Sequence, residues 1–264
     1  MMTMMGAVPS DAEVVPLSSE ANPDPEALAL AGLTVLVAGA TGGTGKEVVK
    51  QLVDLGVPVR ALVRDAAKAR QELPPGDSVE IVTGDVFQYD TVERAMAGCN
   101  AVVCATGNRP SPLDPAGPFN VDYQGTQNLI GAASNAGCEA FVLVSSIGAD
   151  ELFFPLNLFY GVLFWKKRAE EKLQRSGLRY TVVRPGGLKN ELGAGEEEGA
   201  VVMGKAGTFG LPPKETPGSI LRSQVASVCV KALREPDAAN KVVEIVAKAD
   251  QPPTTLAEAF ASVL

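Results

Sequence analysis

The chain has 264 residues, of which 46% are hydrophobic and 20% are charged, so it is long enough to bury the core of one α/β domain or of two small ones. Its formal net charge of −8 argues against a protein that holds nucleic acid or an anionic membrane through a general positive field, and we expect no nucleic-acid partner. The chain contains no histidine, which excludes histidine general bases, Ser/His/Asp triads and histidine-ligated zinc sites.

Residues 1–31 are predicted to form a disordered acidic tail. They include the acidic, proline-bearing stretch "SDAEVVPLSSEANPDPEA", and no basic residue precedes Lys46. A transit peptide would be rich in arginine and serine, and a secretory signal needs a basic start and an apolar run, so neither is visible. The remnant of a processed or engineered terminus is the alternative explanation.

From Leu33 onward, short apolar runs alternate with segments of helical character. The runs expected to be strands are 33–39, 57–63, 79–85, 101–107, 140–146, 180–186 and 241–247. Parallel strands covered on both faces are apolar throughout, so this pattern predicts an α/β fold: a Rossmann-type doubly wound sheet of about seven strands, with helices on both faces. We expect one domain, residues 32–264, with a small C-terminal portion on the substrate side.

Two loops interrupt this alternation. The segment 108–119 carries four prolines directly after the fourth strand, and the segment 189–200 is rich in glycine and glutamate after the sixth. Both leave the carboxyl ends of their strands, where open α/β sheets bind ligands.

The turn "GATGGTG" joins the first strand to the first helix and is a candidate nucleotide site. Its spacing, GxxGxxG from Gly39 to Gly45, differs from the GxGxxG dinucleotide fingerprint. A glycine turn that opens a helix still offers bare amides and the helix dipole to a pyrophosphate. Any tight strand-to-helix turn can require glycine, so the turn alone is weak evidence. The expected cofactor-binding residues are Gly39, Thr41, Gly42, Gly43, Thr44 and Gly45.

The end of the second strand favours NADP over NAD. An NAD site would present an acidic residue to the ribose hydroxyls about 20 residues past the turn, whereas this strand ends with Arg64. A guanidinium there can pair with a 2′-phosphate, and Lys68 is a second phosphate partner to consider. The alternatives are that Arg64 is an ordinary surface arginine, or that Asp65 takes the acidic role.

The chain resembles an atypical short-chain dehydrogenase/reductase. The resemblance is carried by motifs that occur in the order expected of that family: "GATGGTG", "LVRD", "GDV", "CATG", "VDYQGTQNLI", "LVSSI", "KKRAEE" and "YTVVRPGGLKNE". The resemblance covers residues 33–263 and is strongest to a plastid and cyanobacterial branch related to the dehydrogenase-like subunit of the chloroplast inner-envelope import machinery. It implies a chloroplast location, whereas the absence of a visible transit peptide leaves a cytoplasmic one as the alternative. It also implies that Asp85 and Val86 lie by the adenine of NADP(H), Ala105, Thr106 and Gly107 by the ribose, and Pro185 and Gly186 near the nicotinamide.

The catalytic residues of this superfamily are only partly present. Typical members use Ser, Tyr and Lys, the last two spaced YxxxK. Ser145, or else Ser146, ends the fifth strand at the expected place, and Lys166 occupies the lysine position. Val162 stands in place of the tyrosine, and Tyr160 points to a different helix face. Lys166 either binds the nicotinamide ribose and serves as acid, or is a solvated lysine of "KKR".

The run "LFFPLNLFYGVLFW", residues 152–165, is too short to span a bilayer, and no transmembrane segment is expected. It is read as core, as an apolar substrate pocket, or as a peripheral contact for a membrane or protein through 152–168. Two functions remain open. One is an NADP-dependent oxidoreductase of an unidentified, hydrophobic carbonyl or quinone-like small molecule. The other is a catalytically weak NADP-binding redox sensor, scaffold or assembly factor.

Overall fold

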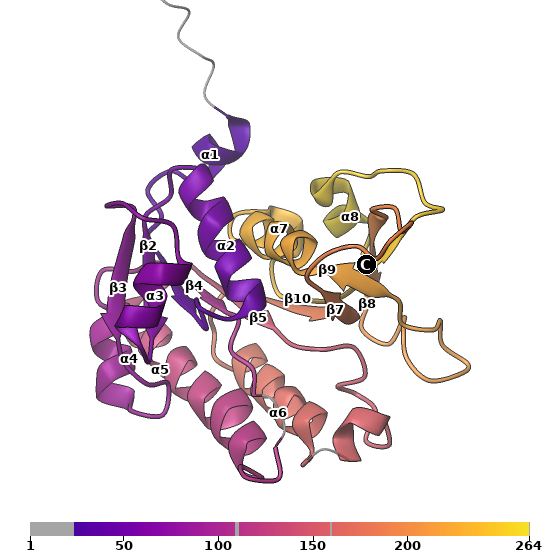
Figure 1. Ribbon diagram of the computed structural model, residues 1–264, viewed down its shortest axis with the longest axis horizontal. Coiled ribbons are helices and arrows are strands. Elements are labelled where there is room, and N and C mark those ends of the chain that lie inside the picture. Colours follow the sequence, from indigo (N-terminus) through magenta and orange to yellow (C-terminus); the bar gives the residue numbers. More distant parts are fainter. Residues whose placement is uncertain (1–23, 109–110, 159, 264) are drawn as a thin grey trace, which may run out of the picture.

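The computed structural model describes residues 24–108, 111–158 and 160–263 (Figure 1). Its centre is an eight-stranded sheet in the order β3-β2-β1-β4-β5-β6-β10-β8. All neighbouring strands pair in parallel except β8, which runs antiparallel to β10 at one edge. The strands are β1 Val35–Ala38, β2 Val59–Val63, β3 Val79–Thr83, β4 Ala101–Cys104, β5 Ala140–Val144, β6 Tyr180–Pro185, β8 Ala200–Lys205 and β10 Lys241–Lys248.

Helices cover both faces of the sheet. One face carries α2 Gly43–Asp54, α3 Ala66–Glu72, α7 Arg222–Ala232 and α8 Leu256–Ser262 (Figure 1). The other carries α4 Tyr89–Met96, α5 Thr126–Ala136 and α6 Val162–Gln174. The shorter elements are α1 Pro25–Ala29, the π-helix η1 Pro118–Gly125, the 3₁₀-helices η2 Pro155–Leu158 and η3 Pro236–Ala238, and the two-stranded parallel sheet of β7 Gly187–Lys189 and β9 Ser219–Leu221.

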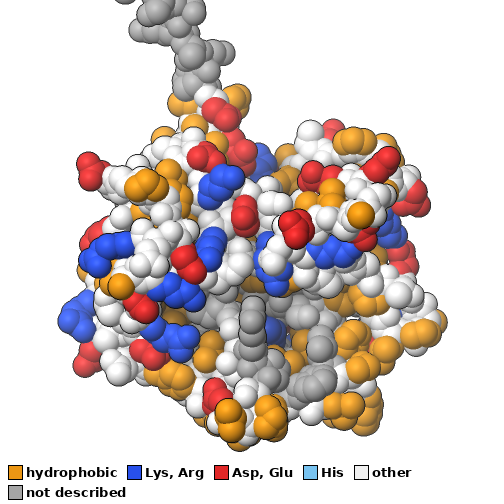
Figure 2. All heavy atoms as spheres, in the orientation of Figure 1, with side chains coloured by type: hydrophobic (Ala, Val, Ile, Leu, Met, Phe, Trp, Pro, Cys, Tyr) orange, Lys and Arg blue, Asp and Glu red, His pale blue; other side chains and the backbone are white. Residues whose placement is uncertain are grey.

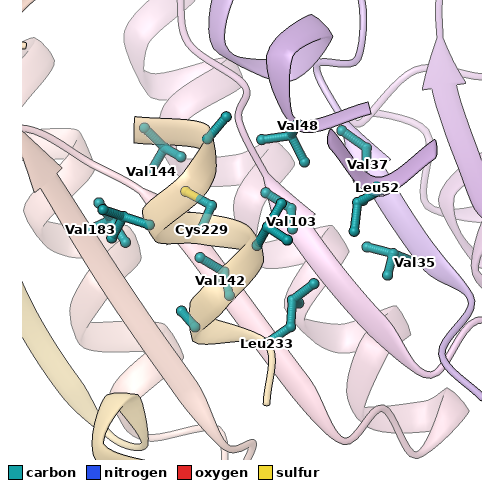
Figure 3. Packing of buried hydrophobic residues seen from close by; sticks show 14 of the residues in the cluster. Val35, Val37, Val48, Leu52, Val103, Val142, Val144, Val183, Cys229 and Leu233 are labelled. Carbon is teal, nitrogen blue, oxygen red and sulfur yellow. The ribbon is translucent and has the colours of Figure 1, made fainter. Parts of the chain in front are cut away.

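The core follows from strand alternation. Successive side chains of β1 point to opposite faces, so Val35 and Val37 join one buried cluster while Leu36 and Ala38 join the other. Figure 3 shows the first cluster, in which Cys229 of α7 and Val48 of α2 pack against the sheet. Two apolar layers on one sheet are the arrangement expected of a doubly wound fold.

The predicted fold class is confirmed, since each of the seven predicted strands coincides with or overlaps a strand of the sheet. Three strands were not predicted: β8, which extends the sheet, and the three-residue β7 and β9. Residues 1–23 of the predicted tail lie outside the described residues. The rest of that range includes α1 and the buried Leu30, which packs on the core.

Candidate functional site

A cavity of about 950 Å³ lies at the carboxyl ends of β1, β2, β3 and β4. Ligands of open α/β sheets bind at this edge. Predicted cofactor residues that line the cavity are Gly39, Thr41, Gly42, Gly43, Arg64, Asp85, Val86, Ala105, Thr106 and Gly107. The remaining predicted ones lie elsewhere: Thr44 and Gly45 inside α2, Lys166 beside the cavity, and Pro185 and Gly186 at the end of β6.

The glycine turn brings backbone close to backbone. Gly39 has a φ of +79°, and a Cβ there would lie 2.7 Å from the carbonyl oxygen of Ala105. A Cβ on Gly45 would overlap the carbonyl oxygen of Gly39, so this glycine lets α2 approach the turn. Gly42 caps α2 without any side-chain hydrogen bond to the first-turn amides. Free first-turn amides and a helix dipole are the features with which helix N-termini bind phosphate groups in other proteins.

Basic side chains outnumber acidic ones among the described residues that line this cavity. Among the described residues that line it, Lys46, Arg64, Lys68 and Arg222 are basic, against the acidic Glu47, Asp85 and Asp114. Figure 2 shows Lys and Arg side chains over the part of this face where α2 and α3 lie. A basic surround compensates the charge of a phosphorylated ligand on a chain whose overall charge is negative.

The side chain of Asp65 is hydrogen-bonded to the backbone and does not line the cavity. Its Oδ1 accepts a hydrogen bond from the backbone N–H of Lys68 at 3.0 Å, which makes it the N-cap of α3. Arg64, one residue earlier, is exposed and lines the cavity together with Lys68. At this strand end two basic side chains line the cavity, whereas the acidic one is bonded to the backbone.

Arg222, at the first position of α7, was not identified from the sequence. Its side chain lies against the glycine turn, because a Cβ on Gly43 would be 2.6 Å from its Cδ. Its Nη1 donates to Oδ1 of Asn190 at 2.7 Å, and both residues line the cavity. The only signal in the sequence is the arginine that opens the helix "RSQVASVCVKA", about 180 residues after the turn that it covers.

Replacing Arg222 by alanine is expected to weaken NADPH and NADH by the same factor, because its guanidinium faces the turn that would hold the diphosphate common to both. A hydrogen bond to a charged group contributes about 1.5–3 kcal/mol, or about tenfold to a hundredfold in affinity. Fluorescence titration with each nucleotide measures this. Arg234→Ala, two residues after the end of α7 and paired with Glu139 at 3.0 Å, is the matched control and should change neither affinity. Loss confined to NADPH would contradict this placement.

Beyond β3, Asp85 shapes the loop that follows the strand. Its Oδ1 accepts from the backbone N–H of Phe87 at 3.0 Å, and its backbone N–H donates to Thr91 Oγ1 at 3.0 Å. These bonds fix Asp85 and Val86 along the wall of the cavity. The positions that the family resemblance gives to the adenine therefore lie on the same cavity as the glycine turn.

Lys166 lies beside the inner end of this cavity and is paired with a residue that the sequence did not single out. Its Nζ is 2.8 Å from Oδ1 of Asp122, which belongs to η1. A Cβ on Gly107, which lines the cavity, would be 3.9 Å from both atoms. A second, small cavity is lined by Asp122, Ser145, Lys166 and Thr106, and Thr106 is shared with the large one.

Ser145 is engaged with a buried group of charges. Its Oγ donates to Oε1 of Glu170 at 2.5 Å, and Glu170 accepts two hydrogen bonds from Arg184, at 3.0 Å from Nε and 2.6 Å from Nη2. Arg184 also contacts Asp150, and it lies 3.3 Å from Glu244. Burial lowers the pKa of Arg184, but its hydrogen bonds to Glu170 and Asp150 raise it above its ordinary value. Ser145 therefore reaches the predicted neighbourhood of Lys166, but its single proton is already donated.

The place of the missing tyrosine is filled by Val162, which is buried at the start of α6. Tyr160 has a φ of +57° and is partly exposed before the helix begins. Among the described residues, no tyrosine lines either cavity.

The aromatic run divides between core and surface. Leu163 is buried, whereas Phe153 is 90% exposed. Phe119, Tyr123, Phe164 and Trp165 form an aromatic cluster, in which Trp165 lies 4.8 Å from Phe119 and 5.6 Å from Tyr123 between ring centroids. Hydrophobic side chains also gather along the lower edge of Figure 2, where Figure 1 places α6. Within the described part of the chain, no helix is long and apolar enough to cross a membrane.

Several known proteins are similar to this chain in sequence or in fold. Residues 39–236 match the NAD(P)H-binding protein family. An uncharacterized chloroplastic protein of Arabidopsis thaliana is 43% identical over 87% of this chain and 82% of its own length. Arabidopsis TIC 62, a chloroplastic protein, is 35% identical over 84% of this chain, which spans 37% of that protein.

A reductase and a solved structure extend the comparison. Sanguinarine reductase of Eschscholzia californica is 33% identical over 82% of this chain and 89% of its own. A Bacillus halodurans structure assigned to the NAD-dependent epimerases/dehydratases is 29% identical, with a TM-score of 0.72 over 87% of this chain and 99% of that one. The chain therefore belongs to the NAD(P)H-binding family of atypical short-chain dehydrogenases/reductases.

Proposed function

We propose that the protein is an NADP-dependent oxidoreductase that reduces a hydrophobic carbonyl or quinone-like small molecule. The observation that carries this proposal is the position of the Lys166–Asp122 pair, which adjoins Gly107 at the inner end of the large cavity. A charged proton donor beside a dinucleotide-sized cavity is what reduction of a polar double bond requires. The 33% identity to sanguinarine reductase supports a reductase over other uses of the cofactor.

Two features support NADP rather than NAD. Arg64 and Lys68 line the cavity at the end of β2, whereas Asp65 is committed to the N-cap of α3. Guanidinium and ammonium groups bind a 2′-phosphate, and an acidic residue would bind the ribose hydroxyls of NAD instead.

The chain's own residues divide the work between binding and proton transfer. Gly39, Gly42 and Gly43 would hold the diphosphate against the α2 amides, with Arg222 over it. When bound, NADPH supplies a hydride. Lys166 would contact the ribose and donate a proton to the carbonyl or quinone oxygen of the substrate. Pro185 and Gly186 remain candidates for the nicotinamide side on the family resemblance alone.

The aromatic cluster supports a hydrophobic substrate. Tyr123 directly follows Asp122 in sequence, and Trp165 directly precedes Lys166. The aromatic pair and the charged pair therefore join the same two elements, η1 and α6. Aromatic faces bind flat apolar molecules through stacking and burial of surface. The relatives from Arabidopsis support a chloroplast location. The exposed Leu152, Phe153 and Leu158 would serve a peripheral contact with a membrane or a protein.

The second candidate function is an NADP-binding redox sensor, scaffold or assembly factor with little turnover. The observation that favours it is Val162 in place of the tyrosine, together with the engagement of Ser145 by Glu170.

Turnover separates the two candidates. The enzyme hypothesis predicts that NADPH absorbance is lost in the presence of a suitable quinone, aldehyde or ketone. Lys166→Ala should lower this rate by about 10²–10⁴-fold, the usual contribution of a general acid, while NADPH still binds. Lys172→Ala, an exposed lysine of the same helix, is the matched control. Tight NADPH binding without turnover on any of these substrate classes would favour the sensor.

A further inference from the structure

Asp122 is a fully buried carboxylate on the π-helix η1. Its side chain has no exposed surface, and 16% of the Lys166 side chain is exposed. Oδ1 faces Lys166, and Oδ2 accepts no hydrogen bond from the residues that the structure describes. An isolated carboxylate is costly to bury, so a position of this kind requires the lysine charge beside it. π-helical turns are rare and are frequent at functional sites.

The charged form of the buried Lys166 is in turn stabilised by the Asp122 carboxylate. Burial lowers the pKa of the Lys166 ammonium, but the Asp122 carboxylate at 2.8 Å more than offsets this, so the pKa lies above its ordinary value. The other titratable groups facing Lys166 are Cys104 of β4 and Glu170 of α6. Burial raises the pKa of the Cys104 thiol, which leaves it neutral near pH 7, and Glu170 is already bound to Arg184. Asp122 is therefore the acidic group paired directly with this ammonium.

Two hydroxyl groups near Lys166 have hydrogen-bond partners. The single hydroxyl proton of Ser145 goes to Glu170. The hydroxyl of Thr106 lies 3.3 Å from the Cys104 thiol. Lys166 has three N–H donors, and one carboxylate oxygen at 2.8 Å leaves others free to point toward the cavity beside Gly107.

We propose that Asp122 is the positioning residue that keeps Lys166 protonated beside Gly107, so that the Lys166 ammonium donates the proton for which related enzymes use a tyrosine. This inference rests on the proposed reductase function. In the step, the electrophilic carbon of the substrate accepts a hydride from NADPH, and the carbonyl π pair moves to oxygen. The oxygen takes a proton from Lys166, so an N–H bond breaks and an O–H bond forms. The substrate is reduced by two electrons, NADPH is oxidised to NADP⁺, and Lys166 regains its proton from water.

The test follows the lysine amines by NMR in protein labelled with [¹³C,¹⁵N]lysine, without cofactor. Lys166→Arg assigns the Lys166 signal, and Lys172 is the exposed internal reference. In the unaltered protein, the midpoint of Lys166 should lie at higher pH than that of Lys172. In Asp122→Asn it should move below that of Lys172, since the lysine stays buried after its partner charge is removed. Asp122→Glu should restore the higher midpoint, and Asp237→Asn, at an exposed position, should leave it unchanged.

The outcomes separate this inference from the proposed function. A Lys166 midpoint at or below that of Lys172 in the unaltered protein overturns the inference, and so does a midpoint that Asp122→Asn leaves unchanged. The first of these comparisons needs no variant at Asp122, so it decides the matter even if Asp122→Asn does not fold. NADPH titration of the same samples tests the proposed function separately, because absent binding contradicts that function whatever the lysine does.

Discussion

Replacing Arg184 by leucine is expected to lower the free energy of unfolding by about 3–5 kcal/mol, the cost of removing one partner from a buried ion pair. Only 1% of the Arg184 side chain is exposed, and its partners Glu170 and Glu244 are equally buried. The substitution removes the guanidinium from the buried carboxylates of Glu170 and Glu244, and Lys167, 3.9 Å from Oε2 of Glu170, is the cation that stays near them. Urea unfolding followed by circular dichroism measures the change.

Arg184→Leu should also change the orientation of the helix that carries Lys166. Glu170 follows Lys166 by one helical turn and joins α6 to β6 through Arg184, so this contact fixes the rotation of the helix that carries Lys166. Glu244 also accepts the backbone N–H groups of Gly207 and Phe209, each at 2.8 Å. The matched control is Arg175→Leu, an exposed position after α6, which should change stability by less than about 0.5 kcal/mol. A loss below 1 kcal/mol in Arg184→Leu would mean that water reaches this cluster.

Arg64→Asp is expected to weaken NADPH by about tenfold to a hundredfold and to leave NADH almost unchanged. The guanidinium would face the 2′-phosphate, which NADH lacks, and a charged hydrogen bond of about 1.5–3 kcal/mol corresponds to that range. Titration of both nucleotides at two salt concentrations measures the effect, since an exposed pair weakens as salt rises.

The control for Arg64→Asp is Arg70→Asp, which makes the same change of charge on the exposed surface of α3, away from the residues that line the cavity. If both variants weaken NADPH alike, the effect is the general field of the protein rather than a contact. Equal losses of NADPH and NADH in Arg64→Asp would contradict the 2′-phosphate assignment.

The fold could be predicted from sequence where the signal is local. Strands such as 101–104 and 140–144 are apolar throughout because they are buried on both faces, and this pattern is visible in one short window. The edge strand β8 is only partly buried, and it is defined by antiparallel pairing with β10, about 40 residues later. Its position depends on long-range pairing that no local pattern reveals.

The candidate site, like the fold, could be predicted from sequence only where its residues are close together along the chain. Gly39 and Gly42 could be proposed from sequence because a turn between strand and helix is contiguous, whereas Arg222 reaches the turn only in the folded chain. Asp122 had a signal that could have been used. It shares a buried helical stripe with Thr126, Leu129 and Ala133, and a carboxylate among such residues demands a partner. Arg184 and Glu244 carried the same signal, because each charge stands between apolar residues in the interior of a strand.

The most direct test of the account is a calorimetric titration of the unaltered protein with NADPH and, separately, with NADH. The cavity with Arg64 and Lys68 at its edge predicts one site per chain, with NADPH bound at least about tenfold more tightly, a difference of about 1.4 kcal/mol. Absence of binding for both nucleotides, or tighter binding of NADH, would contradict it.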